Sequence, residues 1–140
     1  MPDNKTVIRR LCDEIFTRKD LTSFWDVVSP DVVDHQQIIL AQPEGSKGVE
    51  EGVRALHVAF PDLRVDVDEL LEEGSKVAAY LKISGTNTGD YRGLPQPTGR
   101  RALWDAVAIF TLEDGRITEI RGQADRMGML TQLGVLPDMD

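Results

Sequence analysis

The last predicted hairpin of the chain brings together the residues best suited to bind a small molecule and react with it. Its turn is Asp114-Gly115, the strongest short hairpin signal in the sequence. If these two residues form the whole loop, Trp104 faces Asp125 across the two strands, and Ala106 faces Gln123. Side chains alternate along a strand, so these four residues share one side of the sheet. That side would carry an aromatic ring, a small residue that leaves space, and polar groups.

The same register extends this wall. It places Arg121 opposite Ala108, and Phe110 opposite Glu119. Small residues beside aromatic rings, with a few convergent polar groups, are typical of a pocket for a flat apolar ligand. We therefore expect Trp104 and Phe110 to contact the ligand's rings, and Gln123 and Arg121 to contact its oxygens. A β-bulge in this hairpin would shift the pairing by one residue.

Asp125 is the candidate catalytic residue, and two interpretations of it stay open at the level of the residues. In an apolar pocket the charged form of a carboxylate is disfavoured, which would suit Asp125 for moving a proton at carbon. Asp125 also stands directly before a predicted helix that begins near Arg126, where an aspartate commonly caps the first turn.

Other polar residues could also take part in binding. His35 follows a Val-Val strand near a loop, so it is either a donor at the pocket rim or an ordinary hydrogen-bonded histidine. Tyr80 either bonds the substrate or satisfies a neighbour on its strand. The sequence contains no metal-ligand spacing, P-loop, dinucleotide glycine pattern or nucleophile elbow. It therefore predicts no metal and no cofactor.

The elements that must position these residues follow from hydrophobic periodicity. Apolar spacing predicts helices over 4–16, 21–28, 49–60 and 127–133, and alternation predicts strands over 32–35, 64–68, 77–83, 100–112 and 117–124. The segment 89–99, rich in Gly and Pro, predicts a loop that could overhang a pocket mouth. Helices first and strands later indicate an α+β fold. We expect a cone-shaped α+β barrel, with helices packed on a curled antiparallel sheet that encloses an apolar cavity, in a single domain over 1–140.

Composition limits the partners. Sixteen Lys and Arg against 24 Asp and Glu give the 140-residue chain a net charge of −8, which argues against nucleic acid and against an anionic membrane surface. The single cysteine, Cys12, excludes an internal disulfide, and the polar N-terminus lacks the apolar segment of a signal peptide. These features predict a cytoplasmic protein.

One face of the last hairpin is too apolar for water. In the expected register Leu103, Val107 and Ile109 form a row on the side turned away from the cavity. A contiguous exposed apolar row is typical of an interface. We therefore predict a homodimer formed through the sheet.

Several segments resemble SnoaL-like ester and polyketide cyclases. The segment from Thr86 to Arg101, which includes GDYRGLPQPTGRR, is similar to the corresponding segment of that family. The same is true of the closing and early landmarks, which are Ile109-Phe110, Glu113-Asp114-Gly115-Arg116-Ile117, Ala124-Asp125, Leu130-x-Gln132-Leu133-Gly134, Val33-Asp34-His35 and Ala59-Phe60-Pro61-Asp62-Leu63. The similarity covers nearly the whole chain.

The resemblance implies a nuclear-transport-factor-2-like cone and a cofactor-independent enzyme. Members of the family close rings in aromatic polyketides by intramolecular aldol condensation. Asp125 matches the family's acid/base aspartate, which favours the catalytic interpretation over the cap. The expected substrate is an aromatic polyketide or a similar apolar polycyclic ketone. A non-catalytic small-molecule binding module is the alternative of a different class, because the cone fold also hosts such modules.

The sequence also departs from the pattern of the family. Many members carry a histidine on the strand where this chain has Ala106-Val107-Ala108, and a tryptophan where it has Arg121. A second proton donor is therefore missing or replaced. Some cyclase-like members of anthracycline antibiotic pathways are linked instead to hydroxylation of the polyketide. The resemblance thus leaves a hydroxylase that works with a reductase partner as the alternative within the family.

Overall fold

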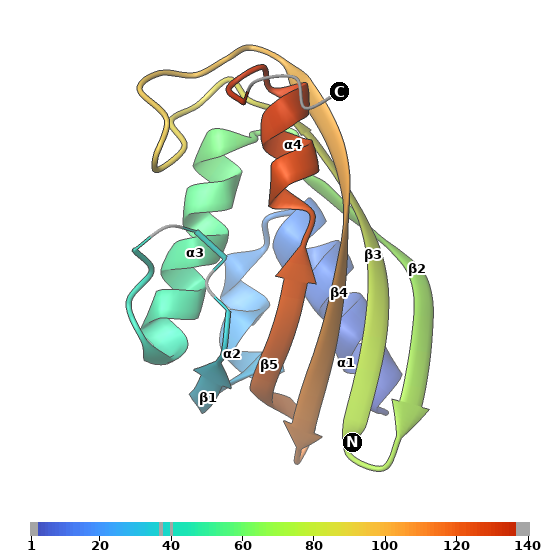
Figure 1. Cartoon of the computed structure of the whole chain (residues 1–140). Helices are drawn as coiled ribbons and strands as arrows, with labels where there is room; N and C mark the ends of the chain where they lie inside the picture. The colour runs from blue at the N-terminus through green and yellow to red at the C-terminus, as the bar shows by residue number, and fades with distance from the viewer. Residues whose placement is uncertain (1–2, 37, 40, 137–140) are drawn as a thin grey trace.

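Most helices come from the first half of the chain and the long strands from the second half (Figure 1). The computed structural model describes residues 3–36, 38–39 and 41–136. Its helical elements are α1 (Asn4–Arg10), η1 (Leu11–Thr17), η2 (Leu21–Ser23), α2 (Phe24–Val27), α3 (Gly45–Ala59) and α4 (Arg126–Gln132). Its strands are β1 (Val28–Asp34), β2 (Arg64–Glu73), β3 (Lys76–Thr86), β4 (Arg101–Glu113) and β5 (Arg116–Ala124). The predicted helices and strands are all present.

The first helix shows how local signals set the layers. Asp3 caps α1, because its Oδ1 accepts the backbone N–H of Thr6 at 2.8 Å. The apolar stripe of α1 and η1 is buried against the sheet. The spacing predicted one continuous α-helix over 4–16, whereas η1 has the wider π-helical turn.

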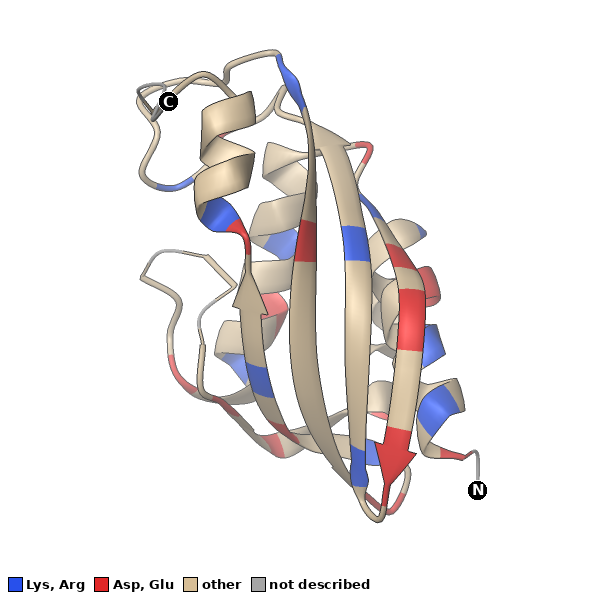
Figure 2. Ribbon diagram, turned by 45° about the vertical axis from the view of Figure 1, so that its right-hand side comes forward, with Lys and Arg blue, Asp and Glu red and all other residues tan. Residues whose placement is uncertain are grey.

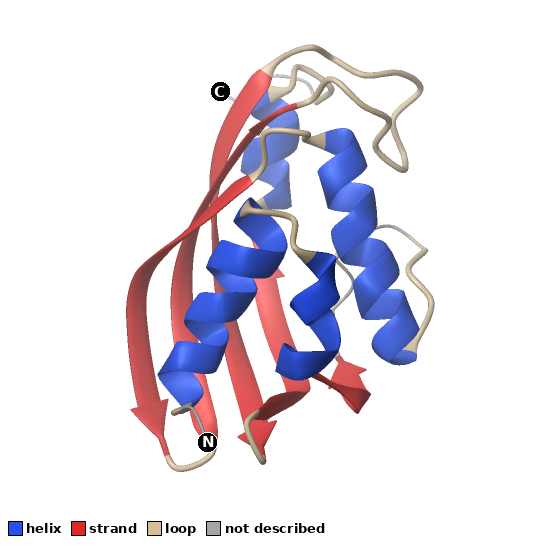
Figure 3. Ribbon diagram, turned by 180° about the vertical axis from the view of Figure 1, so that it is seen from behind, coloured by secondary structure: helices blue, strands red, loops and turns tan. Residues whose placement is uncertain are grey.

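The five strands form one curved sheet in the order β1-β5-β4-β3-β2, and the helices cover its inner face (Figure 3). The strands β2 to β5 pair antiparallel, as predicted. The prediction of an all-antiparallel sheet was wrong at the edge, because β1 pairs parallel with β5. A parallel pair needs a long crossover connection, which α3 and the three intervening strands supply here.

The last hairpin contains the bulge that would upset the predicted pairing. Asp114 and Gly115 have φ angles of 51° and 78°, and a two-residue type I′ turn requires positive φ at both of its central residues. Beside the turn, Leu112 pairs with Ile117, in the predicted register. The register then shifts by one residue, so that Thr111 pairs with Glu119. Thr118 is the extra residue in β5.

The shift corrects the predicted wall of the cavity. Ala106 now pairs with Ala124 and Phe110 with Ile120, whereas the sequence predicted Gln123 and Glu119 as their partners. Because side chains alternate, a slip of one residue transfers a whole set of side chains to the opposite face of the sheet. The inner face is therefore more apolar than predicted.

The core fills the space between the helices and the inner face of the sheet. Ile8 and Ile15 from the first helical segment, Phe24 from α2, and Phe60 after α3 are fully buried there. In the described part of the chain, no helix is both long and apolar enough to cross a membrane.

Candidate functional site

A cavity of about 280 Å³ lies between the helices and the inner face of the sheet. The inward-facing residues of β4 that line it are Trp104, Ala106, Ala108 and Phe110, and those of α3 are Val49, Val53 and Leu56. This volume lies near the lower end of the range for small-molecule pockets. The walls are mostly apolar, so the site suits an apolar ring system. The structure thus places both predicted aromatic residues, Trp104 and Phe110, on the cavity wall.

Aromatic rings close one side of the cavity. The ring centroids of Phe60 and Trp104 lie 5.3 Å apart, and those of Phe60 and Tyr91 lie 5.9 Å apart with an edge-to-face geometry. Tyr91 belongs to the connection between β3 and β4 and lines the cavity, so this loop does reach the site as predicted. Arg92 anchors the loop through an ion pair with Glu51 of α3. Sequence reasoning placed Tyr91 in the loop but did not identify it as a site residue.

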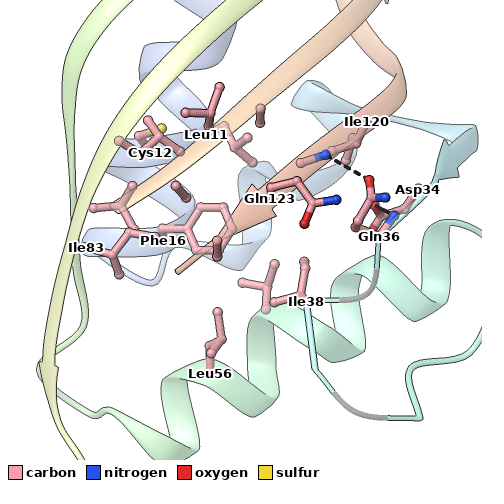
Figure 4. A pocket seen from close by; sticks show the side chains of 18 of the residues that line it. Leu11, Cys12, Phe16, Asp34, Gln36, Ile38, Leu56, Ile83, Ile120 and Gln123 are labelled. Carbon is pink, nitrogen blue, oxygen red and sulfur yellow. Dashed lines mark hydrogen bonds between the residues drawn. The ribbon is translucent and has the colours of Figure 1, made fainter. Parts of the chain in front are cut away.

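The polar residues of the lining gather at one end of the cavity (Figure 4). Asp34 and Gln36 come from the end of β1 and the loop after it, and Gln123 and Arg126 come from the end of β5 and the start of α4. The opposite end is formed by apolar side chains, including Leu11 and Phe16. Gln123 and Arg126 are exposed, so the polar end is also the mouth.

Asp34 is the one aspartate or glutamate among the lining residues that the structure describes. The backbone N–H of Gln36 donates to its Oδ1 at 3.2 Å, and Gln42 Nε2 donates to its Oδ2 at 3.2 Å. Burial raises the pKa of Asp34, and this effect outweighs the opposing hydrogen bonds. Within the described residues, no three His, Cys, Asp or Glu side chains are grouped so that they could hold a metal ion.

Asp125 lies at the cavity mouth and caps α4. Its Oδ1 accepts the backbone N–H of Gly128 at 2.9 Å, and its own N–H donates to the carbonyl of Asp105. The side chain is exposed and is not part of the cavity lining, although its neighbours Ala124 and Arg126 are. The structure therefore shows the capping role and places the carboxylate beside the mouth rather than on the inner wall.

The remaining predicted polar residues lie on the outer face of the sheet. His35 Nε2 is 2.7 Å from Oε2 of Glu119, and Arg121 lies 3.9 Å from the same carboxylate. The hydroxyl of Tyr80 donates to Asp105. The bulge explains the position of Arg121, because it turns this side chain outward, opposite Ile109. These three residues are not part of the cavity lining.

The family match and the similar sequences relate this chain to cyclases, and a similar solved structure shares its fold. Residues 6–133 match the family described as SnoaL-like polyketide cyclase. The chain is 29% identical to nogalonic acid methyl ester cyclase of Streptomyces nogalater over 78% of this chain and 81% of the relative. It is 27% identical to aklanonic acid methyl ester cyclase DnrD of Streptomyces peucetius, over 91% of this chain and 88% of the relative. The solved structure of AclR from Streptomyces galilaeus, provisionally classed as a hydroxylase, superposes with a TM-score of 0.81 at 28% identity and covers 97% of this chain and 87% of that one.

Proposed function

This chain belongs to the family of SnoaL-like polyketide cyclases, and from that membership we propose that it closes a ring in an aromatic polyketide by intramolecular aldol condensation. The observation that supports this function best is the polarity of the cavity, which is apolar along its length and polar at its mouth. Such a pocket orients a polycyclic substrate with its rings inside and its reacting oxygens at the polar end. The relatives named above act on methyl esters of nogalonic and aklanonic acid, so a methyl ester of this class is the substrate we propose.

The proposal assigns a role to each part of the site. Trp104 and Phe110 hold the ring system, and Gln123 at the mouth bonds a substrate oxygen. Asp125 takes the proton from the carbon beside a carbonyl. The cap supports this role, because the N–H of Gly128 fixes one carboxylate oxygen and thereby orients the other. A substrate that extends to the mouth would bring its acidic carbon next to Asp125.

The proposed function is tested by measuring whether the purified protein converts the ester without any added cofactor. Purified protein is incubated with aklanonic acid methyl ester under nitrogen, and the product is separated and weighed by mass spectrometry. An aldol condensation that only closes a ring leaves the mass unchanged, so the expected product is an isomer of the substrate. Tight binding of the ester with no conversion would contradict the enzyme and support a binding module.

A specific observation keeps hydroxylation as the second candidate. The chain is similar to AclR, and Ala106 and Ala108 place no proton donor on the inner face of β4. A hydroxylase would join the substrate carbanion to one oxygen atom of O₂, and two electrons from a reductase partner, with protons from solvent, would reduce the other oxygen atom to water. The same incubation in air with a flavin reductase and its reductant distinguishes the two functions, because hydroxylation adds one oxygen to the mass.

The assembly we propose is a cytoplasmic homodimer formed through the outer face of the sheet. Leu103, Val107 and Ile109 are exposed there by 56%, 44% and 42%. Long stretches of β3 and β4 contain no charged residue (Figure 2). Apolar rows of this kind, flanked by charged pairs such as Lys82 with Asp105, suit a self-complementary interface. The buried single cysteine, Cys12, fits a reducing compartment.

A further inference from the structure

We propose that Asp34 is the second acid/base residue of this site and donates the proton to the oxygen of the attacked carbonyl. The inference rests on the aldol function proposed above. It assigns to β1 the role of proton donor that the inner face of β4 does not supply.

The position of Asp34 supports this role. It is the last residue of β1, it lines the polar end of the cavity, and it is half-buried. β1 pairs with β5 there, with Asp34 beside Ile120, and Gln36 Oε1 accepts the N–H of Gly122 at 3.1 Å. Asp34 thus lies next to the strand that leads into Asp125, so one carboxylate at the end of β1 and another just after β5 flank the same end of one cavity.

A buried amide holds the Asp34 carboxyl in place. Gln42 is only 6% exposed, its Nε2 donates to Asp34, and its Oε1 accepts the N–H of Ile38 at 2.8 Å. Gly52 of α3 makes room for this amide, because a Cβ at that position would lie 2.5 Å from Gln42 Oε1. A side chain that is held by both its oxygens and supported by a buried glutamine is preorganised for transfer to a fixed point.

The proton balance of the step is complete. Asp125 takes the proton from the α-carbon, and the electron pair of that C–H bond forms the new bond to the carbonyl carbon. The carbonyl π bond breaks, and its electron pair moves onto the oxygen. The resulting alkoxide takes the proton of Asp34. The product is an alcohol, and the site is left with neutral Asp125 and ionised Asp34. Solvent at the mouth restores both.

The surroundings of Asp34 favour the protonated form that this role needs. Burial raises its pKa, whereas the Gln42 and Gln36 donors, the adjacent residue His35 and Arg126 of α4 act in the opposite direction. A bound apolar substrate removes more water from the carboxyl and so acts in the same direction as burial. The site therefore pairs a half-buried acid with an exposed base.

The test is the pH dependence of turnover of aklanonic acid methyl ester. A proton donor acts only in its protonated form, so the rate should fall at high pH and give the pH profile an alkaline limb. This limb should lie at higher pH in kcat than in kcat/KM, because kcat reports the enzyme with substrate bound, in which Asp34 is more desolvated. Asp34→Asn should lower kcat by about a hundredfold and remove the alkaline limb. A folded Asp34→Asn protein that keeps both the rate and the alkaline limb would overturn the inference. A wild-type protein without turnover would instead overturn the aldol function, and the inference with it.

A second variant separates a proton donor from a structural residue. Gln42→Met removes a donor that stabilises the Asp34 anion, so the alkaline limb should move to higher pH. If Asp34 only holds the loop in place, Gln42→Met should leave the alkaline limb at the same pH. That result would also overturn the inference. If Asp34→Asn does not fold, two measurements on wild type and Gln42→Met still test Asp34 as the proton donor. One is the shift of the alkaline limb, and the other is a ¹³C NMR titration of the aspartate carboxyls. A ¹³C resonance that titrates with the alkaline limb and moves with it in Gln42→Met supports Asp34, whereas the absence of one contradicts it.

Discussion

Two aspartates at the polar end of the cavity occupy opposite environments. Asp34 is half-buried and bonded by two amide groups, whereas Asp125 is exposed and bonded by the first turn of α4. Sites that move protons in both directions commonly contain two titratable groups whose surroundings favour different protonation states. The cap and the proposed catalytic role of Asp125 are compatible, because the cap uses one carboxylate oxygen.

At the scale of the residue, Asp34 should make the stability of the protein depend on pH. Its folded pKa is raised above the unfolded value of about 3.9, so its contribution is fully present below that value and is lost as the pH rises through the folded pKa. Asparagine cannot ionise and escapes this loss. The melting temperature of Asp34→Asn should therefore rise relative to wild type between pH 3 and pH 7. Thermal unfolding measures this, with the exposed Asp31→Asn on the same strand as control; a difference that is constant with pH would contradict it.

The sequence identified Asp125 as a candidate site residue but did not identify Asp34. Asp125 precedes a helix and lies beside a hairpin, so local patterns and the family resemblance both identify it. Asp34 enters the site only because β1 pairs parallel with β5, a contact between segments far apart in the chain. Gln42 and Tyr91 were missed for the same reason, since each reaches the site from a loop whose path no local pattern defines.

At the scale of the element, the β-bulge decides which side chains of β5 face the cavity. The residues of β5 that follow Thr118 are shifted by one place, which puts Ile120, Gly122 and Ala124 on the inner face. Helix and strand positions were predictable from periodicity, and the Asp114-Gly115 turn from its composition. The bulge was not, because Thr118 carries no signal that distinguishes an extra residue from a paired one.

A prediction about helix α4 follows from the close contact between Gly128 and the Asp125 cap. A Cβ at Gly128 would lie 2.2 Å from Asp125 Oδ2, so Gly128→Ala should displace the carboxylate. Alanine in place of glycine stabilises a helix by about 1 kcal/mol, and loss of a cap costs about as much, so the melting temperature should change little. Turnover should nevertheless fall, by about a hundredfold, because the base is misplaced. Thr131→Ala in the same helix is the control, and unchanged turnover in Gly128→Ala would argue against Asp125 as the base.

At the scale of the whole molecule, the helices pack on the inner face of a curved sheet, and no described helix covers its outer face (Figure 2). The α+β architecture and the apolar cavity follow from the order of helices and strands along the chain. The parallel edge strand does not follow, because strand order depends on how the crossover packs. The net charge of −8 makes two copies repel each other, so the proposed dimer depends on its apolar area.

The dimer leads to a prediction about a single outward residue. Ile109→Lys places a charge within the apolar row beside Arg121 and should shift the protein to monomer in sedimentation at micromolar concentration. Val58→Lys alters a more exposed apolar residue on α3, within the helix layer, and should leave the dimer intact. Added salt should strengthen the wild-type dimer by screening the repulsion. A wild-type protein that sediments only as monomer would refute the interface.

In the proposed mechanism, the Asp125 carboxylate at the cavity mouth moves a proton at carbon. The most direct measurement is exchange of the α-hydrogen of aklanonic acid methyl ester with deuterium in D₂O, followed by mass spectrometry, because it detects proton removal even when no ring closes. Wild type should catalyse exchange, and Asp125→Asn, which keeps the cap, should lose about a hundredfold of that rate while it still binds the ester. Exchange by Asp125→Asn at the wild-type rate would contradict the claim.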